Sequence, residues 1–171
     1  GGVSPTDLKR TVGPPARPYR DGDSATFWVA DLDSVTAHTI TATVKLVSQH
    51  AYWYVDDSLS LSLEDLREAA RAFEETIHPT ITLALGDIWN PGVDNDPRLT
   101  VLHTRITGAE GYFGAQDEFP ITVHPHSNER EMIYMEGSRL RPGSALYLAV
   151  LAHEFHHAVH WNLDPSEDSW V

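Results

Sequence analysis

The chain has 171 residues, with 12 Lys and Arg against 25 Asp and Glu, and its formal net charge at pH 7 is −13. A hydrophobic content of 41% and a charged content of 22% are typical of a globular domain with a sizeable core. An acidic chain lacks the basic surface that nucleic acids and anionic membranes attract, so we expect neither as a partner. Cysteine is absent, which excludes disulfides and thiolate ligands and leaves His, Asp and Glu to hold any metal. No apolar run approaches the ~18 residues of a membrane span.

Residues 1–24 contain four prolines, together with Gly13 and Gly22, and they predict an irregular leading arm, with a disordered tail as the alternative. We treat residues 25–171 as one folded unit. Its beginning is rich in β-branched and aromatic residues and, in part, alternates apolar with polar positions. Strands are therefore expected at 26–30, 38–46 and 51–55.

A helix is expected to begin at Ser62, because Ser62 is a good N-cap and Asp65 follows at the third helical position. An apolar stripe at spacings of three and four continues this helix. Its members are Leu63, Leu66, Ala70, Phe73 and Ile77. Pro79 is expected to end the helix. The stripe indicates a structural helix that covers a sheet.

Two more strands are expected at 81–85 and 99–106, followed by a loop-rich segment at 107–143. The loop between the two strands is dense in Asp and Asn, and hard cations prefer several oxygen ligands from one loop. Asp94 and Asp96 are therefore candidate calcium ligands. The alternative is that these side chains cap their own backbone, and the spacing does not match a helix–loop–helix calcium loop.

The strongest chemical signal lies in the last predicted helix, which begins after Ser144 and is apolar at nearly every position, so we expect it to be buried. His153, Glu154 and His157 form the H-E-x-x-H pattern within it. Residues four apart on a helix share a face, so the two imidazoles can bind one zinc ion. Glu154, beside the first ligand, can take a proton from a water activated by the metal and pass it to a leaving amine.

A set of core histidines is the alternative interpretation of this helix. Burying these ionisable groups without partners would cost several kcal/mol, which a bound metal would remove. His160 lies about 10 Å along the helix axis from His153, too far to share the ion. Zinc needs a third protein ligand. The position six residues after His157 is Leu163, so the long three-histidine pattern is absent.

The stretch from Ala152 to Trp161, followed by Asn162–Val171, resembles the active-site region of glutamate-zincin metallopeptidases, similar to immune inhibitor A and hyicolysin. The resemblance is strong over residues 145–171, looser over 86–135 and faint before that. It implies an α+β fold like the upstream half of thermolysin: a twisted mixed sheet, a covering helix and the buried metal helix. It also implies a secreted bacterial protein.

The resemblance implies zinc-dependent hydrolysis of peptide bonds in a peptide or protein substrate, with His153 and His157 as zinc ligands and Glu154 as general base and acid. It places the third ligand, a glutamate, just past Val171, together with a downstream lobe. Residues 25–171 would then be the N-terminal part of a catalytic domain, with little or no activity by itself. The alternatives are a non-catalytic metal-binding or protein-binding module and a purely structural domain.

Overall fold

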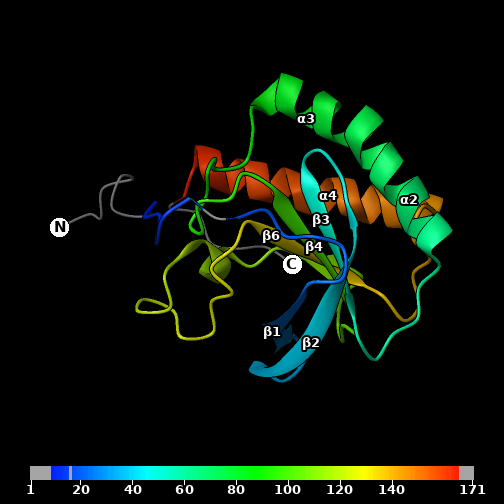
Figure 1. Cartoon of the computed structure of the whole chain (residues 1–171), viewed down its shortest axis with the longest axis horizontal. Coiled ribbons are helices and arrows are strands. Elements are labelled where there is room, and N and C mark those ends of the chain that lie inside the picture. The colour runs from blue at the N-terminus through cyan, green and yellow to red at the C-terminus, as the bar shows by residue number, and fades with distance from the viewer. Residues whose placement is uncertain (1–8, 16, 166–171) are drawn as a thin grey trace.

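The structure, a computed structural model, describes residues 9–15 and 17–165. It is an α+β fold built on one curled six-stranded mixed sheet with the strand order β1-β2-β3-β4-β6-β5. The pairs β1–β2, β2–β3 and β5–β6 are antiparallel, whereas β3–β4 and β4–β6 are parallel. The long helices lie together against one face of this sheet (Figure 1). The α+β class and the mixed sheet agree with the prediction.

The strands are β1 (Ser24–Asp31), β2 (Thr36–Val47), β3 (Ala51–Asp56), β4 (Leu99–Thr104), β5 (Gly111–Tyr112) and β6 (Met132–Glu136). The helical segments are α2 (Leu63–Ala72), the π-helical turn η1 (Phe73–Ile77), α3 (His78–Leu85), the 3₁₀ turn η2 (Ala115–Glu118) and α4 (Ala145–Leu163). The predicted strands at 26–30, 38–46, 51–55 and 99–106 are confirmed, with ends that differ by at most two residues.

Helix α2 begins as the sequence predicts. The Ser62 side chain accepts a hydrogen bond from the Asp65 N–H at 3.2 Å, and this caps the first turn. Leu66 and Ala70 of the predicted stripe are buried against the sheet, together with Phe73 in η1. Leu63, also placed in the stripe, is instead 43% exposed because it lies at the first turn, beyond the edge of the core.

The predicted helix end at Pro79 and the predicted strand at 81–85 are both wrong. The chain stays helical through η1 and α3 to Leu85, with Pro79 in the first turn of α3. The missing N–H of proline costs least in a first turn, and the π turn before it shifts the hydrogen bonding so that His78 N–H reaches Phe73 O. The short apolar run that follows does not distinguish strand from helix.

The 107–143 segment is mostly irregular, as predicted, but it contains two strands that were missed. β6 is the more important, because it pairs in parallel with β4 and is buried along its whole length. β5 pairs with β6 and forms the sheet edge. Together they place the glycine-rich residues before β5 next to α4, and Gly111 is within contact of Val150.

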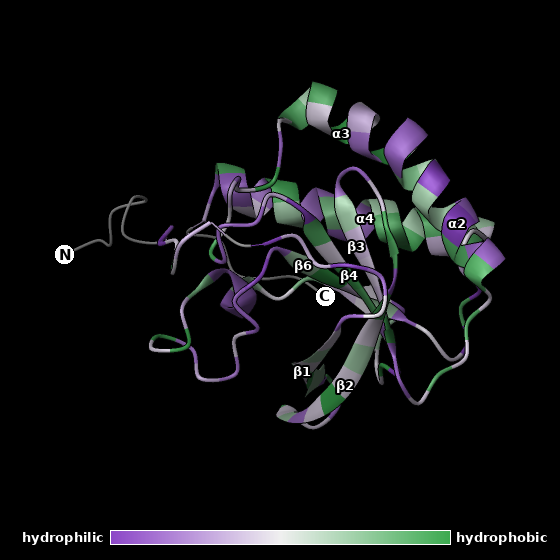
Figure 2. Cartoon of the chain, in the orientation of Figure 1, coloured by the Kyte–Doolittle hydropathy of each residue, from purple (hydrophilic) through white to green (hydrophobic). Residues whose placement is uncertain are grey.

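The sheet carries a core on each face. Trp53, Val101 and Ile133 pack against α2, η1 and α4 on the helical face. Tyr52, Tyr54 and Tyr134 pack on the opposite face, inside the curl of β1 and β2. Strands with parallel neighbours are commonly buried on both faces, as β3, β4 and β6 are here. Figure 2 shows the contrast with α2, whose outer surface is hydrophilic.

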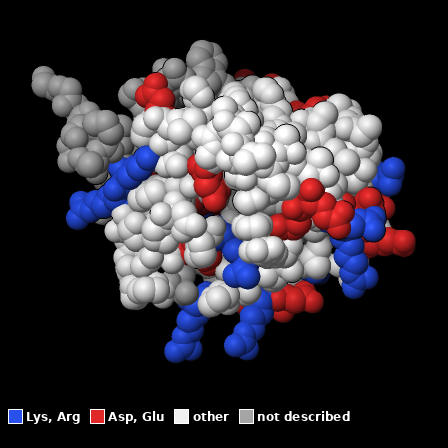
Figure 3. Space-filling view, turned by 90° about the horizontal axis from the view of Figure 1, so that it is seen from above, with Lys and Arg blue, Asp and Glu red and all other residues white. Residues whose placement is uncertain are grey.

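The described part of the leading arm, residues 9–15 and 17–23, forms no helix or strand. It nevertheless contacts the body: Val12 N–H donates to Val93 O, and the ring of Tyr19 lies edge-on to Tyr52. Figure 3, which views the molecule from above the orientation of Figure 1, shows acidic and basic side chains together at the right edge and several basic side chains along the lower edge. Within the described residues, no helix is long and apolar enough to span a bilayer.

Candidate metal and catalytic site

Helix α4 carries the H-E-x-x-H residues and starts at the predicted cap. The Ser144 hydroxyl accepts a hydrogen bond from Tyr147 N–H at 3.3 Å. The prediction that α4 is buried on nearly all sides is wrong: one face packs on the sheet, while Leu146 is 58% exposed. This matters for chemistry, because the exposed face leaves His153 accessible and the inner face holds Glu154.

The two candidate zinc ligands face one another. His153 Nε2 and His157 Nε2 lie 3.0 Å apart, and the two ring planes are nearly perpendicular, at 88°. Two nitrogens bound tetrahedrally to one zinc ion at about 2.0–2.1 Å lie about 3.4 Å apart. The observed separation is close to that value, so both rings can bind one ion after a small adjustment.

The environment of His157 favours the form that binds metals. Burial lowers its pKa, and the neighbouring His153, His156 and His160 lower it further. A histidine must be neutral at the coordinating nitrogen to bind a metal. His156 is exposed, and its ring centroid lies 6.3 Å from that of His160, stacked, and 6.3 Å from that of His157, edge-on.

Glu154 is buried, with 2% of its surface exposed, and its Oε1 lies 4.0 Å from His153 Nε2. Among the described residues, its Oε2 has no hydrogen-bond partner. Burial raises the pKa of Glu154 to about 7. A carboxylate buried without a partner is unfavourable for folding alone, and a pKa near neutrality suits a group that both accepts and donates a proton.

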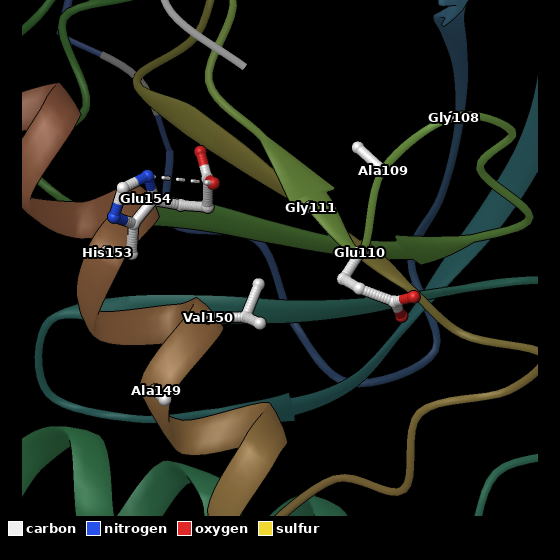
Figure 4. A pocket seen from close by; sticks show the side chains of 8 residues that line it. All are labelled: Gly108, Ala109, Glu110, Gly111, Ala149, Val150, His153 and Glu154. Atoms are coloured by element: carbon white, nitrogen blue, oxygen red, sulfur yellow. Dashed lines mark ion pairs between the residues drawn. The ribbon is translucent and has the colours of Figure 1, made fainter.

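A pocket of about 420 Å³ opens beside this carboxylate (Figure 4). One wall is α4, with Ala149, Val150, His153 and Glu154. The other wall is the glycine-rich approach to β5, and Figure 4 shows Glu110 at the end away from His153. The wall is close to α4 because position 111 has no side chain: a Cβ there would lie 2.8 Å from Val150 Cγ1 and 3.3 Å from Glu154 Cγ.

The sequence did not identify Gly111 or Val150 as part of the site. The glycines at 108 and 111 were visible as breaks in a loop, but their proximity to α4 arises from the pairing of β5 with β6, which the sequence pattern does not show. β5 is also the last strand of the sheet, so its outer edge is not paired with another described strand.

The described residues do not contain a complete metal site made of side chains alone. No group of three or more His, Asp or Glu within 9–15 and 17–165 is arranged to hold an ion. His153 and His157 are therefore a pair of candidate ligands. Residues 166–171, within the strongest part of the family resemblance, lie outside the described residues.

Both candidate calcium ligands accept a hydrogen bond from the backbone N–H two residues further along the loop. Asp96 is 3% exposed, and its carboxylate accepts hydrogen bonds from the Tyr52 hydroxyl at 2.7 Å and from Arg98 N–H at 3.1 Å. Asp94 Oδ1 accepts one from Asp96 N–H at 3.3 Å. Asp96 thus stabilises its own loop, as the alternative interpretation of these side chains describes.

No protein-family model matches the chain, and a comparison with curated proteins found no match.

Proposed function

We propose that this chain provides the zinc-binding and proton-transfer residues for hydrolysis of peptide bonds. The observation that carries the proposal is the convergence of His153 Nε2 and His157 Nε2 at 3.0 Å beside a buried glutamate with an unpartnered oxygen. A histidine pair that serves only to pack the core does not require a buried carboxylate next to it.

Zinc, when bound, would polarise a substrate carbonyl and lower the pKa of water. The protein's own part is carried by Glu154. With a pKa raised to about 7, its carboxylate can accept a proton from the attacking water and return it to the leaving nitrogen of the peptide. The buried position keeps bulk water away from the transferring proton.

The fold also supports an extended peptide as substrate. β5 forms the edge of the sheet and Gly111, within it, lines the pocket that holds Glu154. An extended peptide can add to an unpaired strand edge through main-chain hydrogen bonds. A peptide bound there would pass its backbone along α4, near Glu154. We also propose that the sheet and its helices correspond to the upstream half of the thermolysin fold.

A non-catalytic metal-binding module is the second candidate. It is favoured by one observation: the described residues offer two histidines and no third ligand. Two ligands bind zinc more weakly than three, and a catalytic centre also needs a group that stabilises the developing oxyanion.

Zinc stoichiometry and peptide cleavage separate these functions. The chain, stripped of metal and then titrated with zinc, is expected to bind one equivalent. Because the described residues supply two ligands, a quenched fluorescent peptide library is expected to show only slow cleavage, which 1,10-phenanthroline abolishes. Zinc binding without chelator-sensitive cleavage favours the module.

His157→Ala should lose zinc, whereas His156→Ala is the matched control, because His156 lies in the same helix and is exposed. Zinc binding that is unchanged in His157→Ala contradicts both metal-dependent functions.

A further inference from the structure

Two glutamates outside α4 are buried against one another. Glu118 is 0% exposed and Glu131 is 1% exposed, their carboxyl groups are in contact, and none of the four side-chain oxygens has a hydrogen-bond donor from any other described residue. Buried carboxylates in proteins are normally hydrogen-bonded, paired with a cation or bound to a metal. This pair therefore needs an explanation.

The fold holds the two residues together across different elements. Glu118 ends η2 and Glu131 directly precedes β6. Arg130 N–H donates to Asp117 O at 3.0 Å, and Thr100 N–H donates to Glu131 O at 2.8 Å. These backbone bonds fix η2, the start of β6 and β4 relative to one another, and so hold the two glutamates side by side.

A third acid approaches from the Gly92 loop. A Cβ built on Gly92 would lie 3.4 Å from both Glu131 Oε1 and Asp94 Oδ1, and 2.9 Å from Glu131 Cγ. The two oxygens therefore face the same point in space. Gly92 has a φ of +82° and carries no side chain, which leaves this point open to them.

The described groups around these acids do not compensate for their burial. Burial and the Glu131 carboxylate raise the pKa of Glu118 well above its ordinary value, and burial raises the pKa of Glu131 to about 8. Burial, and then Asp96, raise the pKa of Asp94 to about 7. Three nearby acids are thus held in an environment that disfavours their ionised forms.

The other charged groups around the pair are engaged elsewhere. Asp117 accepts hydrogen bonds from Asn128 N–H and the Tyr134 hydroxyl. Lys9 lowers the pKa of Glu131, but its ammonium donates to Asn162 O at 2.7 Å. Arg130 donates to Tyr54 and Thr100. Neither cation is hydrogen-bonded to the glutamates.

We propose that Glu118 and Glu131 hold a divalent hard cation, best matched by Ca²⁺, with Asp94 as the third acidic ligand. An all-oxygen set suits calcium rather than zinc, and calcium accepts six to eight oxygens that include backbone carbonyls and water. The three acids are not already arranged as a complete site, so Asp94 turns toward the glutamates when the ion binds. Asp96 is excluded, because both of its carboxylate oxygens accept hydrogen bonds, from Tyr52 and Arg98. Asp94 Oδ1 accepts the longer bond from Asp96 N–H, at 3.3 Å, which it exchanges for the ion.

Such an ion would join three segments that are distant in sequence: the Gly92 loop, η2 and the start of β6. It is independent of the zinc site, since it uses no residue of α4. Its expected effect is therefore on the stability of the fold, because an ion that binds only the folded state stabilises that state.

Calcium titration tests the site directly. The chain, freed of metal with EGTA, is titrated with CaCl₂ by calorimetry, and thermal unfolding is followed at several calcium concentrations. We expect one calcium ion per chain and a Tm that rises with the logarithm of the calcium concentration. Terbium luminescence, excited through the protein's aromatic residues, gives a readout that does not depend on stability.

Variants locate the ion. Glu131→Gln and Glu118→Gln should each lower calcium affinity at least tenfold, while the exposed Glu75→Gln should not change it. The double variant His153→Ala/His157→Ala should bind calcium as the parent does. Circular dichroism checks that each variant folds.

The proposal is overturned if the parent binds neither calcium nor terbium, or if Glu131→Gln binds as well as the parent. A Tm that rises on acidification from pH 8 to pH 6 but ignores calcium would also overturn it, and would show that the two carboxyl groups share a proton instead.

Discussion

The buried carboxylates discussed above fall into two sets, which differ in the hydrogen bonds that they accept. Asp56 and Glu136 lie at the ends of β3 and β6 and are fully bonded: Asp56 accepts from Ser58 and Thr104, and Glu136 accepts from Ile106, Ser138 and Arg139. Glu154, Glu118 and Glu131 are equally buried but leave oxygens without partners.

The pKa values of the two sets move in opposite directions. Burial by itself would raise the pKa of Asp56 and of Glu136, but the hydrogen bonds that each accepts outweigh it and hold both pKa values below their ordinary values. The pKa values of Glu154 and Glu131 rise instead, because neither carboxylate accepts enough hydrogen bonds to offset the effect of burial. Fully bonded carboxylates stabilise the fold, and unbonded ones are available for a proton or a cation.

The largest effect expected from this comparison is on catalysis. Glu154→Gln keeps the size of the side chain but removes its ability to accept a proton. Under the proposed function, peptide cleavage should fall by about 10²- to 10⁴-fold, the usual contribution of a general acid–base group. Zinc binding should persist, because His153 and His157 are unchanged. Steady-state kinetics and metal analysis measure the two properties, and full activity in this variant would disprove the assigned role.

The same substitution at Glu136 should damage stability instead. In Glu136→Gln, the amide turns an NH₂ toward backbone N–H donors that the carboxylate oxygens now satisfy. We expect the free energy of unfolding to fall by about 1.5–3 kcal/mol, the range for hydrogen bonds to a charged group. Glu154→Gln, which replaces an unpartnered carboxylate, should lose no stability. Urea unfolding of both variants is the test, and equal losses would erase the distinction between the two sets.

Local patterns explain which parts could be predicted. His153, Glu154 and His157 lie within about one turn of α4, so their spacing alone places the two histidine rings on one face of the helix. The strands at 26–30 and 51–55 were marked by β-branched and aromatic residues. The caps Ser62 and Ser144 also behave as expected, since capping depends on the next three residues.

Features that depend on distant segments could not be predicted in this way. The run at 81–85 is apolar in either structure, and its helical form depends on the π turn before it. β6 is a short apolar run within a segment rich in Gly and Pro, and its place in the sheet depends on its pairing with the distant strand β4, which the local sequence does not reveal. Glu118 and Glu131 are 13 positions apart, and no periodicity links them.

The pH dependence of stability offers a third, smaller test. Glu131 has a folded pKa of about 8 and an ordinary value of 4.5, so between these values the folded state binds its proton more tightly than the unfolded state does. Stability must then decrease as pH rises through this window. For the metal-free chain we therefore expect a lower free energy of unfolding at pH 8.5 than at pH 6.

The lowered pKa values of Asp56 and Glu136 predict that stability also falls at acidic pH. Their lowered pKa values contribute stability that is present above the ordinary pKa of a carboxyl group and is lost as pH falls through the lower, folded values. Urea midpoints from pH 3 to pH 9 should therefore pass through a maximum. Glu131→Gln should flatten only the alkaline side, and an unchanged alkaline side would contradict the buried pair as its cause.

The smallest expected effect concerns the wall of the pocket rather than its carboxylate. In Gly111→Ala, the new methyl group would lie 2.8 Å from Val150 Cγ1 and 2.9 Å from Tyr134 O, so β5 has to move away from α4 by a few tenths of an ångström. Overpacking of this kind costs about 1 kcal/mol. Because Glu154 Cγ is also only 3.3 Å away, cleavage should fall severalfold through a higher KM.

Gly137→Ala is the matched control for this substitution. Its methyl group would also be crowded, at 2.7 Å, but by the flexible end of Leu59, which can move aside. The control should therefore lose stability to a similar or smaller extent while KM stays unchanged. If both variants alter KM equally, the change reflects general loosening of the fold, and the edge of β5 has no special place in binding the peptide.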